Sequence, residues 1–138
     1  DYVIDAIDSL KDKISLILRA SERKGRLFSS MGAALKMDPT RVKTGEFWEV
    51  QGCPLAATIR RKMRRTKRFP ANRFTCVYDD ELLPNRGGSE KNDCDGIQDG
   101  PIRKACINGS AVSVTAIFGM TLSGLIINDI YKKTLMRK

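Results

Sequence analysis

The first 24 residues carry apolar side chains at the period of an amphipathic helix. Val3, Ile7, Leu10, Ile14 and Ile17 recur at alternating steps of four and three residues. Acidic residues lie near the start of this segment and basic residues near its end, which suits the helix dipole. A helical spacing resumes after Gly25 and continues until a proline stops it. The pattern therefore predicts a long N-terminal amphipathic helix.

Strand-like alternation follows in three shorter segments. Residues 41–50 and 73–78 carry β-branched and aromatic side chains at alternate positions. In residues 111–123, apolar side chains alternate with six residues of which four are serine or threonine. These segments predict a small antiparallel sheet.

Two further helices are expected. Residues 54–68 begin with proline, which is favoured at the first helical position, and residues 125–138 are amphipathic with a basic end. No charged residue occurs in the apolar segment 105–128, so a second interpretation takes 110–131 as one helix, inserted in a membrane or central in a bundle.

The predicted fold class is α+β: a single domain, 1–138, with the long N-terminal helix packed on the antiparallel sheet, a C-terminal helix and two disulfides. The alternative is an all-α bundle in which 54–68 and 110–135 are helices. It ranks second because glycine and β-branched residues make 111–124 a poor helix.

Cysteine usage suggests export. Cys53, Cys76, Cys94 and Cys106 are widely spaced, which favours two disulfides of unknown pairing over a zinc site; four free thiols are the alternative. Asn108 opens an Asn-Gly-Ser triplet, a glycosylation candidate. No signal peptide is visible, so either this is a mature chain or the inference of export is wrong; we expect a secreted glycoprotein.

The sequence contains no histidine, which excludes histidine-based catalysis and most catalytic zinc sites. Glu46 and Glu49 would lie on opposite faces of a strand, so they make a poor pair of catalytic carboxylates. The acidic loop 79–100 resembles a calcium loop at Asp93–Gly100 but has Lys104 where the final glutamate would stand. We expect no enzyme activity, no cofactor and no metal.

The net charge of +9 is concentrated in the basic segment 60–73, which contains no acidic residue. Such a cluster attracts polyanions. The expected partners are an anionic membrane surface or a sulfated glycan, together with a possible protein receptor; nucleic acid ranks behind them. Arg65-Thr66-Lys67-Arg68 also has the form of a proprotein-convertase cleavage site. The polyanion-binding candidates are Arg60, Arg61, Lys62, Arg64, Arg65, Lys67, Arg68 and Arg73.

Together these patterns predict a secreted, basic, non-enzymatic protein that binds anionic surfaces and perturbs membranes, of the toxin, antimicrobial or fusion-promoting type. The alternative is a soluble cytokine-like ligand with a heparin-binding patch. The candidate membrane contacts are Val112, Val114, Phe118, Met120, Leu122, Lys132 and Lys133.

Overall fold

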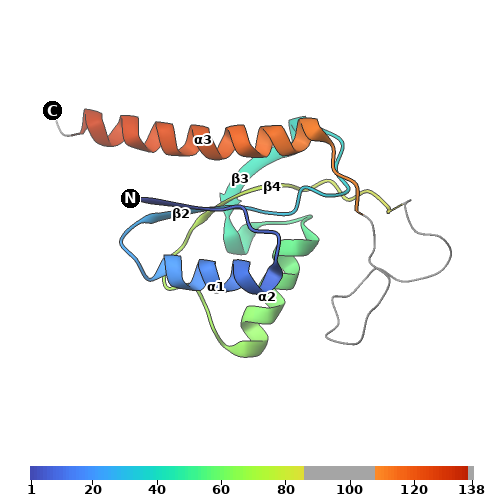
Figure 1. Ribbon diagram of the computed structural model, residues 1–138, viewed down its shortest axis with the longest axis horizontal. Helices are drawn as coiled ribbons and strands as arrows, with labels where there is room; N and C mark the ends of the chain where they lie inside the picture. The colour runs from blue at the N-terminus through green and yellow to red at the C-terminus, as the bar shows by residue number, and fades with distance from the viewer. Residues whose placement is uncertain (86–107, 137–138) are drawn as a thin grey trace.

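A computed structural model describes residues 1–85 and 108–136 of the chain. A central sheet lies between two helical layers, with α3 on one face and α1 and α2 on the other (Figure 1). The elements in chain order are β1 (Tyr2–Asp5), α1 (Leu10–Ser21), β2 (Arg26–Ser30), η1 (Pro39–Arg41), β3 (Val42–Glu46), η2 (Phe47–Glu49), α2 (Pro54–Thr66), β4 (Thr75–Asp79) and α3 (Val112–Leu135).

The sheet is mixed, with strand order β1-β2-β4-β3. β1, β2 and β4 are parallel, and β3 pairs antiparallel with β4 at one edge. The connection from β1 through α1 to β2 is a βαβ unit, which brings the carboxyl ends of both strands to the same edge.

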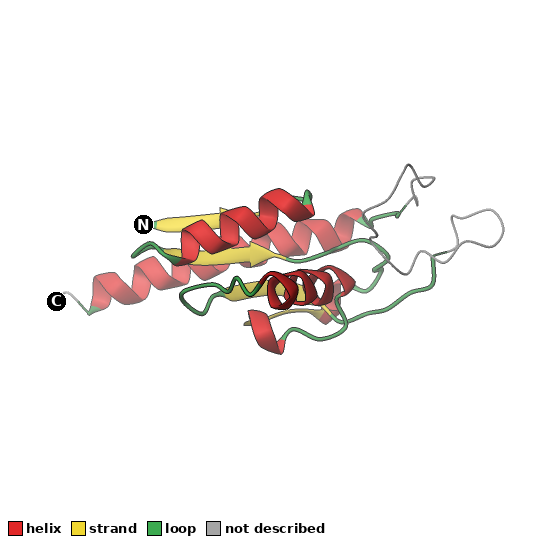
Figure 2. Ribbon diagram, turned by 90° about the horizontal axis from the view of Figure 1, so that it is seen from below, coloured by secondary structure: helices red, strands yellow, loops and turns green. Residues whose placement is uncertain are grey.

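Each face of the sheet buries its own hydrophobic core. On one side Ile17 of α1 and both Ile59 and Met63 of α2 are fully buried together with Phe47. On the other side the apolar stripe of α3 packs on Phe28 and Val77. Figure 2, turned by 90°, shows α1 and α2 side by side in front of the strands and α3 behind them.

A buried ion pair joins the carboxyl ends of β1 and β2 to the start of α1. Lys13 Nζ lies 2.9 Å from Asp5 Oδ2, and neither side chain is more than 1% exposed. The ammonium also donates to the carbonyls of Ile7 (3.2 Å) and Ser30 (2.7 Å), while Ser29 Oγ donates to Asp5 Oδ2 at 2.6 Å. Both charges therefore have partners for most of their hydrogen-bonding capacity, which buried charges require.

A second, exposed charge cluster closes the carboxyl end of β4. Asp80 accepts hydrogen bonds from Lys43 and from Arg41 (2.8 Å to Nη2), which both come from the region of β3. These partners lower the pKa of Asp80 from 3.8 to about 2. The cluster ties the end of β4 to the start of β3.

The predicted α+β fold with an antiparallel sheet is wrong, because three of the four strands are parallel. The predicted N-terminal helix is two elements, β1 and α1, separated at Ser9, whose side chain caps α1 by accepting from Asp12 N. The segment after Gly25 is strand β2. Val3 and Ile7 continue the apolar spacing of α1 by coincidence, which conceals the break.

The predicted strand 111–123 is also wrong, since it forms the first half of α3. Val114, Phe118 and Leu122 are buried at steps of four residues, the helical repeat. The all-α alternative correctly makes this segment helical, but the sheet excludes that fold. The helix predicted at 54–68 is confirmed as α2, with Pro54 in its first turn.

Cys53 and Cys76 are buried free thiols, so the prediction of a disulfide for either is wrong. Burial of Cys76 raises its pKa far above the ordinary thiol range, which keeps it protonated. Cys94 and Cys106, like residues 86–100 of the predicted acidic loop, lie outside the described residues.

Replacing Lys13 by methionine should lower the free energy of unfolding by roughly 3–5 kcal/mol, because it leaves Asp5 buried without its counter-charge. Urea denaturation measures the effect. Lys11→Met, at an exposed position of the same helix, is the matched control and should change stability by less than about 0.5 kcal/mol. Equal losses for both variants would contradict a special role for the pair.

The depressed pKa of Asp80 predicts an acid-labile contribution to stability. The ionised carboxylate stabilises the fold above its ordinary pKa of 3.8, and this contribution is lost as the pH falls toward about 2. In urea denaturation at successive pH values, the stability difference between wild type and Asp80→Asn should be constant above roughly pH 5 and shrink below pH 4. A stability difference that stays constant down to the lowest pH would contradict a lowered pKa for Asp80.

Candidate functional site

Helix α2 is placed by features at both of its ends. Gly52, just before it, has φ +65°, and a Cβ there would lie 2.5 Å from the carbonyl oxygen of Asp80. Only glycine fits this position, so the chain enters α2 pressed against the end of β4. At the other end Lys67 takes a left-handed conformation, and Arg68 N donates to the carbonyl of Met63.

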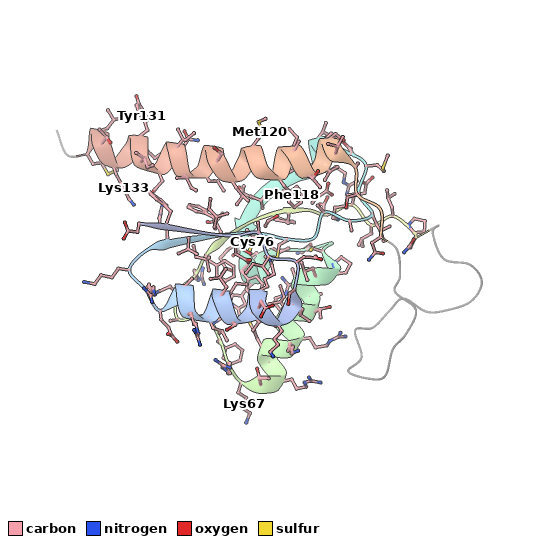
Figure 3. All side chains as sticks on the ribbon, in the orientation of Figure 1. Lys67, Cys76, Phe118, Met120, Tyr131 and Lys133 are labelled. Carbon is pink, nitrogen blue, oxygen red and sulfur yellow. The ribbon has the colours of Figure 1, made fainter. Side chains whose placement is uncertain are left out.

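The basic side chains of α2 gather on the side that faces away from the core. Arg61, Arg64 and Arg65 are spaced three and one residues apart, which places them on one side of the helix, and Arg68 follows just after its end. All four are exposed, as is Lys67, which Figure 3 shows at the end of α2 farthest from the sheet. We call these five residues the basic face.

Two exposed aromatic side chains adjoin the basic face. Trp48, from η2, and Phe69, which follows α2, are 36% and 53% exposed, and their ring centroids lie 6.1 Å apart. The guanidinium carbon of Arg64 lies 5.7 Å from the centre of the Trp48 ring. Cations beside accessible rings are the combination that single-stranded nucleic acids bind, through phosphate contact and base stacking.

The other predicted polyanion-binding residues are used differently. Arg60 is partly buried, donates to the carbonyl of Phe47 at 2.9 Å and lies over its ring, so it serves the core. Lys62 is half-buried. Arg73 is exposed at the amino edge of the sheet, where it lines a separate cavity.

A cleft of about 230 Å³ lies at the carboxyl ends of β1 and β2. Among the described residues Asp8 is the one charged lining residue, and small residues make up much of the wall. A Cβ at Gly32 would come within 3.3 Å of Leu55 Cβ, at the start of α2, so the two walls approach closely. The lining comprises Ala6, Ile7, Asp8, Ser30, Met31, Gly32, Ala33, Ala34, Leu55 and Ser110.

Sequence reasoning missed this cleft because it took the segments on both sides as helix. The available signal was the β-branched pair Val3-Ile4 followed by two aspartates, and then the small residues from Ser29 to Ala34. In an α/β sheet, such residues after a strand mark the edge where ligands bind.

The predicted membrane contacts do not form one surface. Val114, Phe118 and Leu122 face the core, and Figure 3 shows Phe118 pointing from α3 toward the sheet. Val112 and Met120 are exposed, and Lys133 pairs with Asp129 at 2.8 Å. By length and composition alone, α3 is a helix that would be able to cross a membrane. Asn108, the glycosylation candidate, accepts a hydrogen bond from Asn85 at 2.9 Å.

No family model matches the chain. The chain is similar to proteins named tRNA threonylcarbamoyladenosine dehydratase: it is 33% identical over 134 residues to that of Bacillus subtilis (96% of this chain, 51% of the relative) and 33% identical over 129 residues to that of Escherichia coli (86% and 47%). It is 29% identical over 149 residues to dehydratase 2 of Saccharomyces cerevisiae (98% and 32%).

Solved structures of a protein with this name are also similar to the chain. The crystal structure of the E. coli tRNA N6-threonylcarbamoyladenosine dehydratase in complex with ATP has a TM-score of 0.74 and 26% identity, covering 99% of this chain and 50% of that one. Its complex with AMP has a TM-score of 0.71 and 27% identity. The chain thus spans about half the length of these bacterial relatives and less of the yeast one.

These relatives overturn the functional predictions made from composition. They are enzymes that modify tRNA, so the predictions of a non-enzymatic, membrane-active toxin or antimicrobial protein are wrong. The prediction of secretion falls with them, as do an anionic membrane or heparin-like glycan as partner and the cytokine-like alternative; glycosylation of Asn108 stays a prediction. The chain has the mixed α/β fold of a tRNA-modifying dehydratase and resembles such enzymes along almost its whole length.

Proposed function

We propose that this chain is part of an ATP-dependent tRNA-modifying dehydratase of the threonylcarbamoyladenosine type, in which it binds tRNA and forms part of the nucleotide cleft. The observation that carries the proposal is the match over 96% of the chain to a relative of that name, which extends through the cleft and the basic face alike. Two features of the structure fit the two ligands.

The basic face suits the phosphate backbone of tRNA. Its five cations are exposed and lie on one side and at the end of α2. Each cation that contacts a phosphate releases bound counterions, which gives affinity without reading the base sequence. Trp48 and Phe69 add accessible rings on which an unpaired base can stack.

The cleft suits part of a nucleotide. It lies at the carboxyl ends of parallel strands, where ligands of open α/β sheets bind, and its small residues allow close approach of a ligand to the backbone. Its volume of about 230 Å³ is below the usual range for a complete ligand site. A bound ATP would therefore need contacts outside this cleft as well.

The charges that line the cleft indicate which groups would neutralise a bound triphosphate. No cation lines it in the described part of the chain, so a triphosphate would be neutralised by a divalent ion or by groups elsewhere. Asp8 is the lining residue that can hold such an ion. Asp5, which is paired with Lys13, is not available for that role but holds the loop that carries Asp8.

Dehydration requires an oxygen atom to leave, and ATP can activate that oxygen. This explains how a chain without histidine can belong to an enzyme: activation comes from the co-substrate, and the chain's residues bind and orient. The expectation of no enzyme activity followed from excluding histidine-based catalysts and a pair of catalytic carboxylates, and neither exclusion applies to activation by ATP.

Arg61→Gln combined with Arg68→Gln should weaken binding of unmodified tRNA at least about tenfold near 0.15 M salt and reduce the slope of log affinity against log salt by about two, because two phosphate contacts are lost. Filter binding at several salt concentrations measures both. Lys11→Gln combined with Arg19→Gln removes the same charge from exposed positions of α1 and should have a much smaller effect.

Activity is tested by mass spectrometry of nucleosides from tRNA incubated with the purified protein and ATP. The expected product is threonylcarbamoyladenosine lighter by one water, formed only when ATP is present. The basic-face variant should lower kcat/KM for tRNA and leave kcat at saturating tRNA nearly unchanged. Failure of the wild-type protein to bind tRNA would refute the proposal.

A further inference from the structure

A second and larger cavity, of about 700 Å³, lies at the amino edge of the sheet. It opens between the C-terminal part of α3, the amino ends of β2 and β4, and the loop that joins α2 to β4. It lies at the sheet edge opposite the cleft. Open α/β sheets bind ligands at the carboxyl ends of their strands, so that rule does not account for this cavity. Its volume is within the range of small-molecule sites.

The cavity has an apolar floor and a basic rim. Phe28 and Phe74, both 5% exposed, lie at the bottom, with Leu125 beside them. Arg26, Arg73, Lys132 and Lys133 line the cavity against the single acid Asp129, so the charge of the lining is four minus one, or +3. An anionic ligand with an apolar part matches this distribution.

Two of the four cations of the rim, Arg26 and Lys133, are held by hydrogen bonds to one carboxylate. Asp129, 9% exposed, accepts from Tyr2 at 2.5 Å and pairs with both Arg26 and Lys133. Figure 3 shows Lys133 on the sheet-facing side of α3, whereas Tyr131 points outward. The carboxylate thus fixes two cations and the end of α3 over the sheet.

The opposite wall is fixed by Ser21 at the end of α1. Ser21 Oγ, buried, accepts from Ala71 N at 3.0 Å, and its carbonyl accepts from Asn72 Nδ2 at 2.7 Å. The loop that carries Arg73 is therefore anchored beside the cavity. Within residues 1–85 and 108–136, neither Arg73 nor Lys132 makes an ion pair, which leaves both side chains able to bind an anion.

We propose that this cavity binds one nucleotide of the tRNA strand, with its phosphate between Arg73 and Lys132 and its nucleoside over the apolar floor. The inference rests on the proposed function and adds a second contact site to it. The loop between Lys67 and Phe74 connects the basic face directly to the cavity, so one RNA strand can follow cations from α2 to the amino edge.

The first test fills the cavity without changing charge. Asn128 is exposed and lines the cavity, whereas Ser123 is exposed on the same helix and does not. Asn128→Trp should weaken tRNA binding at least about fivefold, and Ser123→Trp should leave it within twofold. Circular dichroism and melting temperature establish that both variants are folded.

The second test removes the two unpaired cations. Arg73→Gln combined with Lys132→Gln should reduce the salt slope of tRNA binding by one to two, compared with the control Lys11→Gln combined with Arg19→Gln. Binding of AMP to wild type and to Asn128→Trp, followed by NMR, distinguishes RNA from a free nucleotide as the ligand. If the cavity binds RNA, Asn128→Trp loses affinity for tRNA.

The outcomes separate the two proposals. Wild-type tRNA binding that Asn128→Trp leaves unchanged overturns the cavity as an RNA site while the proposed function stands. If Asn128→Trp loses AMP binding but keeps full tRNA binding, the cavity binds a free nucleotide and the inference of an RNA site is overturned. Absence of tRNA binding by the wild-type protein refutes the proposed function, and this inference with it.

Discussion

The architecture depends on the buried pair of Lys13 and Asp5. Two charges inside a protein cost several kcal/mol each unless they are paired and hydrogen-bonded, and here both conditions are met. Because the partners come from the end of β1, the first turn of α1 and the end of β2, the pair fixes three segments at once. The loops after β1 and β2 form much of the cleft lining, so the pair and its hydrogen bonds hold this part of the wall in place.

The direction of the strands then separates the molecule into two chemical environments. The cleft at the carboxyl edge is lined by neutral residues and one acid, whereas the cavity at the amino edge is lined by four cations and one acid. Helix α2 joins the cleft to the basic face, since Leu55 lines the cleft and Arg64 belongs to the basic face. At 1.5 Å per residue its 13 residues span roughly 20 Å, a distance that one folded RNA easily covers.

How far the sequence predicts the structure differs between elements for physical reasons. Helix α2 was predictable because Pro54 marks its start and Ile59 and Met63 repeat at helical spacing. Strand β1 was not, because four residues with the same apolar phase as the following helix give no signal of their own. In α3 the serines and threonines mimic strand alternation, and the helical stripe of Val114, Phe118 and Leu122 is hidden because the outer side is apolar too. The charge of the basic segment predicts a polyanion as ligand, but cations alone do not distinguish RNA from a sulfated glycan. The cleft left almost no pattern, since it is made of backbone and small side chains.

The carboxylate of Asp129 has a further thermodynamic consequence. It reduces the net positive charge beside the larger cavity, which by itself weakens attraction for an anion. Yet it also restricts Arg26 and Lys133, whose long side chains would otherwise sample many rotamers. The conformational entropy of ordering them is lost during folding and not during association. The two cations that Asp129 orders are therefore in position before an anion arrives, whereas Arg73 and Lys132, the proposed phosphate contacts, would be ordered only as it binds.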